Sequence, residues 1–326
     1  MPSVMTHSLS TNDYEVEVIV ADNGSADDSV TFLKANYPEV RLIALSKNYG
    51  FAEGYNQALN QVEADLYVLL NSDVEVTPNW IDPIFYLMRS DKTIAACQPK
   101  ILDYNHKTKF EHAGAAGGWM DSLGYPFCRG RVFSTVEEDK GQYDDTQEIF
   151  WATGCALFIR ANLYHKIGGF DGDYFAHMEE IDLCWRLKRA GYRVMACGDS
   201  KIYHLGGGTL KVENPFKTYL NFRNNYITLL KNTSGWKLYW LIPIRLILDG
   251  VAGVLFLTEG KYKNIWAIVR AHWYIFGHFF TIIRKRMTAQ QQVDELYIQP
   301  PTLKGSLKGS LVGRYYILGR KTFDEL

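Results

Sequence analysis

Cysteine is scarce in this sequence, and the few cysteines show no pairing pattern. The 326 residues include five cysteines and no Cys-x-x-Cys pair. An odd number without metal-ligand spacing disfavours a disulfide framework and a zinc site, and it favours a reducing compartment. Residues 1–13 are too polar for a signal peptide. We therefore expect a protein that works in a reducing environment.

Net charge is also almost absent, at −1, but the two parts of the chain differ strongly. Residues 1–210 contain 18 Lys and Arg against 29 Asp and Glu, a net charge of −11, whereas residues 211–326 contain 17 against 7, a net charge of +10. The acidic part suits metal binding. The basic part is rich in aromatic and aliphatic residues, which suits an anionic membrane surface. Because its basic residues interleave with long apolar runs, we expect no nucleic-acid partner.

The first 70 residues alternate between strand and helix patterns. Strands are predicted at 15–22, 40–45 and 66–70, with helices at 30–36 and 55–62 between them. This alternation predicts an α/β fold with a mostly parallel sheet and helices on both faces. The polar turns 22–25, 48–54 and 71–73 each follow a strand, so they should meet at one edge of the sheet. That meeting point favours a nucleotide or phosphate site.

The apolar run 66–70 ends abruptly in Asn71, Ser72 and Asp73. A carboxylate at the end of a buried strand lies where open α/β sheets bind ligands. Mg²⁺ and Mn²⁺ take oxygen ligands of this kind and often share them with substrate phosphates. The alternative is a simple turn after a strand.

Further along, residues 103–148 have no clean period, and we expect an irregular excursion that could wall a cleft. Residues 149–160 predict strand, glycine turn and strand, and 177–191 predict a helix with an apolar face. Three acidic residues, Glu179, Glu180 and Asp182, begin that helix. Helix-dipole chemistry accounts for part of this clustering.

Six segments in this order, 21–25, 48–56, 70–73, 151–154, 179–186 and 203–207, resemble the family 2 glycosyltransferases. These are GT-A-type enzymes that use nucleotide-diphosphate sugars, and the chain looks most like the bacterial rhamnosyltransferase-like branch. The resemblance covers about 14–230 and, more weakly, the helical part that follows. It implies a GT-A, Rossmann-like domain.

The resemblance implies roles in donor binding. Asp22 would accept hydrogen bonds from the base or ribose; the alternative is a turn residue that caps the next helix. Asn48 and Gly50 would pass close to the diphosphate; the alternative is a plain loop before a helix. Asp73 matches the last Asp of the Asp-x-Asp motif that holds the metal. Asn71 occupies the first position, which departs from the family and implies weaker metal binding.

The resemblance also implies that His204, which precedes three glycines, completes the metal site, although a lone His is often structural. An imidazole fits Mn²⁺ better than Mg²⁺.

Glu180 matches the family's general base, which removes the acceptor hydroxyl proton during inverting transfer. Asp182 is the second candidate, although Arg186 one turn on would make it structural. The donor-sugar and acceptor loop is matched by Trp151, Thr153, Gly154 and Glu179. Arg129 and Arg131 are candidates to bind a phosphate, but the resemblance does not assign either of them a place in the site.

Family members usually begin with an apolar strand that helps cradle the base, and residues 1–13 show none. Loss of that strand would weaken nucleotide binding, so an inactive sugar-nucleotide-binding or scaffold relative is the second hypothesis. A nucleotidyltransferase is a third, but the expected basic phosphate-gripping loop near the N-terminus is not seen. The sugar is open, and dTDP or UDP donors are natural expectations.

Apolar stretches follow at 238–257, about one bilayer core long, and at 265–283. Arg245 and Asp249 interrupt the first on one face, which favours a helix lying in the membrane interface over one that spans it. We expect three regions: a catalytic domain at 1–210, a helical membrane-associating region at 211–290 and a loose polar tail at 291–326. The expected acceptor is a glycan or lipid-linked sugar at the cytoplasmic side of the bacterial inner membrane.

Overall fold

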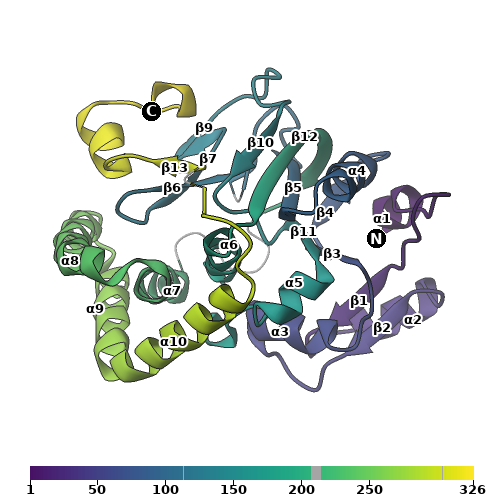
Figure 1. The fold of residues 1–326 in the computed structure, drawn as a ribbon, viewed down its shortest axis with the longest axis horizontal. Coiled ribbons are helices and arrows are strands. Elements are labelled where there is room, and N and C mark those ends of the chain that lie inside the picture. The colour runs from purple at the N-terminus through teal and green to yellow at the C-terminus, as the bar shows by residue number, and fades with distance from the viewer. Residues whose placement is uncertain (113, 207–213, 303) are drawn as a thin grey trace.

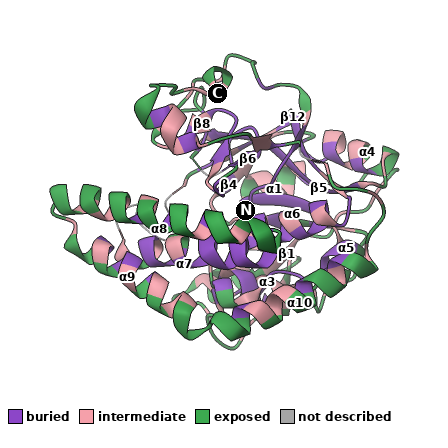
Figure 2. Ribbon diagram, turned by 60° about the vertical axis from the view of Figure 1, so that its left-hand side comes forward, coloured by how far each residue is buried: buried purple, intermediate pink, exposed green. Residues whose placement is uncertain are grey.

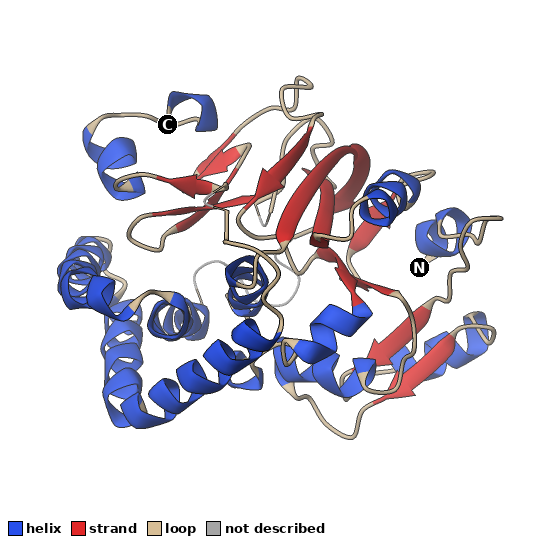
Figure 3. Ribbon diagram, in the orientation of Figure 1, coloured by secondary structure: helices blue, strands red, loops and turns tan. Residues whose placement is uncertain are grey.

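The computed structural model describes residues 1–326 except 113, 207–213 and 303. A six-stranded mixed sheet forms its centre, with strands in the order β10-β12-β5-β11-β3 and with β4 paired to β12 (Figures 1 and 3). The strands are β3 (Leu66–Leu70), β4 (Val74–Val76), β5 (Ile94–Asp103), β10 (Thr146–Ile149), β11 (Ala156–Arg160) and β12 (Arg193–His204).

The central strands are apolar because both faces of the sheet are covered. Nine of the ten residues of β5 are buried, which explains why this segment lacks the alternation of a half-exposed strand. Helix α4 (Asp82–Ser90) packs Ile84 and Met88 against one face. Helices α5 (Ala161–Lys166) and α6 (Glu179–Arg189) contribute to the core on the other. The predicted α/β class is confirmed.

The strand pairing differs from the prediction of a mostly parallel sheet. Strands β1 (Ile19–Asp22) and β2 (Arg41–Ala44) pair in parallel, but they form a separate two-stranded sheet. Strand β3 pairs antiparallel with β11, and among the described strands of the central sheet the one parallel pair is β5 with β12. In the described chain no strand precedes β1, and helix α1 (Pro2–His7) lies there instead. Helices α2 (Ser29–Asn36) and α3 (Gly50–Leu59) flank the small sheet.

The excursion expected at 103–148 contains regular structure. A second sheet has the order β13-β6-β7-β8-β9. Its strands are β6 (Gly118–Asp121), β7 (Pro126–Cys128), β8 (Arg131–Val132), β9 (Thr135–Val136) and β13 (Ser306–Leu307).

The C-terminal segment is packed, and the expectation of a loose tail was wrong. Strand β13 pairs in parallel with β6, so residues far apart in the sequence complete one sheet. Beyond it, Leu311 and Tyr315 are buried against Phe127 and Val132. The short helices η2 (Gly313–Ile317) and η3 (Phe323–Glu325) close the chain, after η1 (Gly172–Tyr174) earlier in the sequence.

Four helices form the region between β12 and the tail. They are α7 (Pro215–Asn232), α8 (Gly235–Thr258), α9 (Tyr262–Gly277) and α10 (Phe279–Glu295). The predicted apolar stretch 265–283 is not one helix, because the chain breaks at His278 between α9 and α10. Helix α7 is largely buried, whereas α8 is largely exposed (Figure 2).

Helix α8 is the one helix in the described part of the chain that is long and apolar enough to cross a membrane by length and composition, with a mean hydropathy of 1.9. Only 17% of that apolar window is buried against the protein. Leu241, Arg245 and Asp249 are the buried residues of α8. Arg245 donates to the carbonyl of Leu123 over 2.9 Å, and Asp249 accepts from His272 of α9 over 3.0 Å. Apart from Lys237 and Thr258 near its two ends, the exposed remainder of α8 is made of apolar and aromatic residues and glycine.

Candidate functional site

Asp73 and His204 meet where two central strands end. Asp73 lies between β3 and β4, and His204 is the last residue of β12, opposite Val74 of β4. His204 Nε2 donates to Asp73 Oδ1 over 3.1 Å. On the other side of the imidazole, Nδ1 lies 3.5 Å from Glu111 Oε2. An imidazole between two carboxylates therefore forms the centre of the site.

The charges of this group reinforce one another. Burial by itself would lower the pKa of His204, but hydrogen bonds with Asp73, Cys155 and Glu111 outweigh it and raise the pKa to about 12. The same hydrogen bond with His204 lowers the pKa of Asp73. His204 is therefore a cation at neutral pH, and it would have to lose its proton to bind a metal.

The donor atoms fit a divalent cation that shares its ligands with a substrate. Asp73 offers a carboxylate oxygen and His204 an imidazole nitrogen, a combination that Mn²⁺ accepts. The amide nitrogen of Asn71 lies 3.4 Å from His204 Nε2, so Asn71 borders this position. In the described chain no group of three or more His, Cys, Asp or Glu side chains is spaced to hold a metal alone. Two of the three glycines after His204, at 207 and 208, lie outside the described residues.

The two loops predicted to bind the donor are held together by side-chain amides. The amide of Asn23 donates to Asn48 Oδ1 over 3.3 Å and to the carbonyl of Gly50 over 2.8 Å. Gly24 has a φ of +72°, and a side chain there would collide with the backbone of Lys47 at 2.5 Å. Asp22 is buried and accepts a hydrogen bond from the backbone N–H of Ser25. The structure thus brings Asp22, Asn48 and Gly50 together.

The segment 50–54, expected as a loop, is the first turn of α3. The ring of Phe51 in this turn lies 3.0 Å from where a side chain on Gly154 would begin. The hydroxyl of Tyr55 donates to the carbonyl of Leu70 over 3.3 Å, at the end of β3. Helix α3 therefore links the donor loops to the strand end that precedes Asp73.

Residues 151–155 are buried and bond to the chain at the end of β3. The backbone N–H of Asn71 donates to the carbonyl of Cys155 over 2.9 Å. Thr153 is buried, with its backbone N–H bonded to Gln98 Oε1. Trp151 is buried as well, and its indole donates to the carbonyl of Trp119. In this structure Trp151 is part of the hydrophobic core, and both side chains are buried.

Glu179 and Glu180 begin α6 beside each other in a poorly hydrated place. Burial raises the pKa of Glu179 well above its usual range, and the charge of Glu180 adds to this. Burial also raises the pKa of Glu180, and backbone hydrogen bonds partly oppose it. One oxygen of each carboxyl is buried without a hydrogen-bond partner among the described residues. Such a carboxyl can take up a proton near neutral pH.

The loop before these glutamates has an unusual backbone. Phe175, His177 and Met178 have φ values of +64°, +70° and +75°, a region that non-glycine residues rarely adopt. Asn224 of α7 holds this loop, because its buried amide donates to the carbonyls of Tyr174, Ala176 and His177 over 3.0, 2.9 and 2.8 Å. The C-terminal helices thereby fix the approach to Glu180.

Asp182, the second candidate base, is fully buried in an ionic network. Its carboxylate accepts from Arg186 over 2.9 Å, from Lys231 over 3.0 Å and from Asn232 over 2.8 Å. The predicted pair with Arg186 is thus present. With both oxygens occupied and no exposure, Asp182 connects α6 to α7 and is not placed to reach a substrate.

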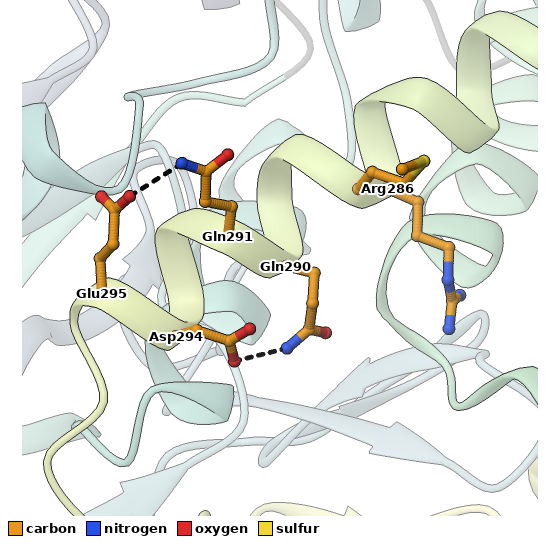
Figure 4. Close-up of a pocket in the computed structure, with 6 residues that line it drawn as sticks. Arg286, Gln290, Gln291, Asp294 and Glu295 are labelled. Carbon is orange, nitrogen blue, oxygen red and sulfur yellow. Dashed lines mark hydrogen bonds between the residues drawn. The ribbon is translucent and has the colours of Figure 1, made fainter.

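Two other features lie outside the site. Arg129 is paired with Asp145 over 2.5 Å and lies over the ring of Tyr143, so its charge is balanced, although its buried Nη1 has no hydrogen-bond partner among the described residues. A cavity of about 710 Å³ runs along α10 (Figure 4), but none of the predicted site residues lines it. Its side chains pair along the helix, Gln290 with Asp294 and Gln291 with Glu295.

Sequence reasoning missed Glu111 and Asn224. Glu111 follows β5 in the excursion that shows no period, and Asn224 lies within an otherwise ordinary helix. An acidic residue next to His112 and a polar Arg223-Asn224-Asn225 run in an otherwise apolar stretch are the local signals that the sequence offers.

The fold is shared with a solved glycosyltransferase structure. The crystal structure of GalNAc-T7 with UDP, GalNAc and Mn²⁺ superposes with a TM-score of 0.53 at 14% identity. The match covers 73% of this chain and 45% of that one. It supports the predicted GT-A-like α/β architecture.

Sequence comparison gives the family. The model described as Glycosyl transferase family 2 matches residues 4–168, about half of the chain. The chain therefore belongs to glycosyl transferase family 2, and it is a glycosyltransferase.

Two similar proteins align with this chain over more residues than the family model does. The N-acetylglucosaminyl-diphospho-decaprenol L-rhamnosyltransferase of Mycobacterium tuberculosis is 26% identical over 249 residues, which cover 72% of this chain and 80% of the relative. The low-salt glycan biosynthesis hexosyltransferase Agl10 of Haloferax volcanii is 21% identical over 216 residues, covering 65% and 66%. The prediction of a rhamnosyltransferase-like family 2 enzyme is confirmed.

Proposed function

We propose that this protein moves a sugar from a nucleotide-diphosphate sugar to a glycan or lipid-linked acceptor, with inversion of the anomeric carbon. The observation that carries the proposal is the Asp73–His204 pair at the strand ends, connected through residues 151–155 to α6 and its Glu180. The contact that makes this connection is the backbone N–H of Ala152 on the sulfur of Cys184, at 3.5 Å.

In this proposal Asp22 binds the base or ribose, and Asn48 and Gly50 lie along the diphosphate. Asp73 and His204 would hold Mn²⁺ or Mg²⁺, which when bound neutralises charge on the leaving diphosphate. Mn²⁺ is the better fit because of the imidazole. A dTDP- or UDP-sugar is the proposed donor.

Glu180 is the proposed general base. It removes the proton of the acceptor hydroxyl as that oxygen attacks the anomeric carbon and the nucleotide diphosphate leaves. Direct displacement from the opposite face inverts the configuration. Trp151, Thr153, Gly154 and Glu179 would line the space for the donor sugar and acceptor.

The proposed place of work is the cytoplasmic side of the bacterial inner membrane, in cell-surface polysaccharide synthesis. The similar mycobacterial enzyme is named for a diphospho-decaprenol acceptor, a lipid. Exposed apolar residues on α8 and α9, such as Ile247 (68% exposed) and Trp273 (71%), suit an interfacial contact.

The alternative is a sugar-nucleotide-binding or scaffold relative without turnover. Two observations favour it: Asn71 stands at a metal position, and the β1–β2 sheet is separate from the central sheet.

Calorimetry with a panel of nucleotide-diphosphate sugars, with and without Mn²⁺, tests both. We expect metal-dependent binding of one donor and its loss in Asp73→Asn, followed by transfer to a lipid-linked acceptor. Donor binding without transfer to any acceptor tried would favour the scaffold alternative, and no donor binding at all would contradict both.

A further inference from the structure

The C-terminal segment presents three consecutive apolar side chains to the outside. Tyr316, Ile317 and Leu318, at the end of η2, are 60%, 82% and 63% exposed. The residues just before them behave in the opposite way, because Leu311 and Tyr315 are buried against the second sheet. Exposed aromatic and aliphatic side chains that lie together on a packed segment mark a contact surface. We call Tyr316, Ile317 and Leu318 the tail patch.

The support behind the tail patch is fixed by hydrogen bonds. The hydroxyl of Tyr315 is 2.8 Å from Thr135 Oγ1, and Lys321 Nζ donates to the carbonyl of Tyr315 over 2.9 Å. The backbone N–H of Leu311 donates to Asp121 Oδ2 over 2.8 Å. The inner side of the segment is thus occupied by the sheet, and the tail patch is held on its outer side.

The turn between β6 and β7 joins this segment to α8. Tyr125 in the turn packs against two clusters, one that contains Tyr315 and one that contains Leu241 of α8. Arg245 of α8 donates to the carbonyl of Leu123 in the same turn. Figures 1 and 2 both show the C-terminal segment on the same side of the molecule as α8. The tail patch and the exposed apolar face of α8 therefore flank one turn.

The charge around the tail patch is of one sign. Residues 304–323 contain five basic residues and no acidic one. Four of the five are exposed, namely Lys304, Lys308, Arg320 and Lys321. Of the two acids that follow, Glu325 accepts from the backbone N–H groups of Lys321 and Thr322.

This combination fits an anionic bilayer better than a second copy of the chain. A bilayer takes apolar side chains among its headgroups, and its phosphates attract the flanking cations. A symmetric contact between two copies would instead bring the same basic residues face to face, which is unfavourable.

We propose that the tail patch is a second point of attachment to an anionic membrane, beside the α8–α9 surface. The inference rests on the membrane contact of the proposed function, and it is independent of the donor, the metal and the base. Tyr316, Ile317 and Leu318 enter the headgroup region, with Lys308 and Arg320 at the level of the phosphates. Two attachment points on separate elements hold the catalytic domain in one orientation on the bilayer.

A fluorescent label on the full chain tests the contact directly. The five cysteines are buried, so Ile317→Cys supplies an exposed thiol that an environment-sensitive dye can label. Vesicles of phosphatidylcholine and phosphatidylglycerol should shift the emission to shorter wavelength, and vesicles of phosphatidylcholine alone should shift it much less. The same dye on the control Phe32→Cys, at a position of α2 that is 52% exposed, should not respond.

Vesicle sedimentation with unlabelled protein measures the affinity. The double variant Ile317→Ser and Leu318→Ser should weaken binding to the anionic vesicles about tenfold, because the apolar contact is lost. The double variant Lys308→Gln and Arg320→Gln should also weaken it about tenfold, and added salt should weaken the wild type. Lys321 is left in place because it supports Tyr315.

The charge control is the double variant Lys34→Gln and Lys140→Gln. Both lysines are exposed and lie outside the C-terminal segment, so the net charge changes equally while the tail patch is untouched. Its binding should stay within about twofold of the wild type. The residues replaced in the tail variants are all exposed, and thermal unfolding checks that these variants remain folded.

A label at position 317 that does not respond, while the wild type sediments with anionic vesicles, would overturn the proposal. An emission shift that appears without vesicles as the protein concentration rises would assign the tail patch to a second copy and overturn it as well. A wild type that does not sediment would overturn both the proposal and the membrane contact. Calorimetry with UDP and Mn²⁺ would then show whether the catalytic part of the proposed function still holds.

Discussion

The side-chain amide of Asn224 donates to the main-chain carbonyl of His177 over 2.8 Å. His177 lies in the strained loop before Glu179 and Glu180, and Asn224 is completely buried. A helix outside the segment matched by the family model therefore positions the proposed base.

Asn224→Ala should lower kcat about tenfold or more, because the loop loses the donors that hold its left-handed backbone in place. Donor affinity should stay within about twofold, since the donor loops are not involved. Asn225→Ala is the matched control: Asn225 is also buried in α7, but it donates to the carbonyl of Gly124. Equal losses of kcat in both variants would show that general destabilisation, and not the loop, is responsible.

Glu180→Gln should lower kcat by about 10²–10⁴, because the amide cannot accept the acceptor proton. Donor binding should remain. Burial raises the pKa of Glu180 to about 7, so wild-type kcat should fall as the pH drops through that value and the carboxylate becomes protonated. Initial-rate kinetics from pH 5.5 to 9 measure both effects. Should Glu179→Gln lose activity while Glu180→Gln keeps it, the base would be Glu179.

Mn²⁺ binding should release about one proton from His204. The pKa of His204 is raised to about 12, so the imidazole is protonated throughout the neutral range and must lose its proton to bind metal. Affinity for Mn²⁺ should therefore rise about tenfold per pH unit between pH 6 and 9. Calorimetry in buffers of different ionisation enthalpy counts the protons. His204→Asn should remove the slope, and a wild-type affinity independent of pH would argue against His204 as a ligand.

Asp182→Asn should lower the free energy of unfolding by about 3–5 kcal/mol, because it leaves the buried Arg186 without its counter-charge, while Lys231 keeps Asp171 at 2.8 Å. Lys231 and Arg186 hold the pKa of Asp182 below its usual range against the opposing effect of burial. The stabilisation should thus be complete at neutral pH and be lost as the pH falls through the lowered pKa. Urea unfolding at pH 7 measures it. Unchanged stability together with lost activity would instead indicate that Asp182 acts as the general base.

The α8–α9 surface should bind anionic vesicles. The double variant Trp273→Ser and Phe276→Ser removes two side chains that are 71% and 70% exposed, and it should weaken binding in a vesicle sedimentation assay about tenfold. Phe32→Ser on α2, 52% exposed, is the control and should have no effect. Equal binding by all three proteins would place the membrane contact elsewhere.

The sequence by itself determined the α/β class, the apolar strand 66–70 and the acidic start of α6. These depend on neighbours within one element: a buried strand needs a continuous apolar run, and a helix needs its apolar face every three to four residues. The order of six short motifs then determined the family, and with it the choice of Asp73, His204 and Glu180 as residues to consider.

Tertiary structure decided the rest. A hydrophobic pattern shows that a strand is buried but not which strand lies beside it, so the antiparallel pairing of β3 with β11 was not predicted. Asp182 and Glu180 are two positions apart, yet only the packing of α7 on α6 encloses Asp182 in an ion network, while one oxygen of Glu180 is buried without a partner among the described residues. Glu111 and Asn224 acquire their roles from contacts with residues 93 and 47 positions away, which local sequence does not encode.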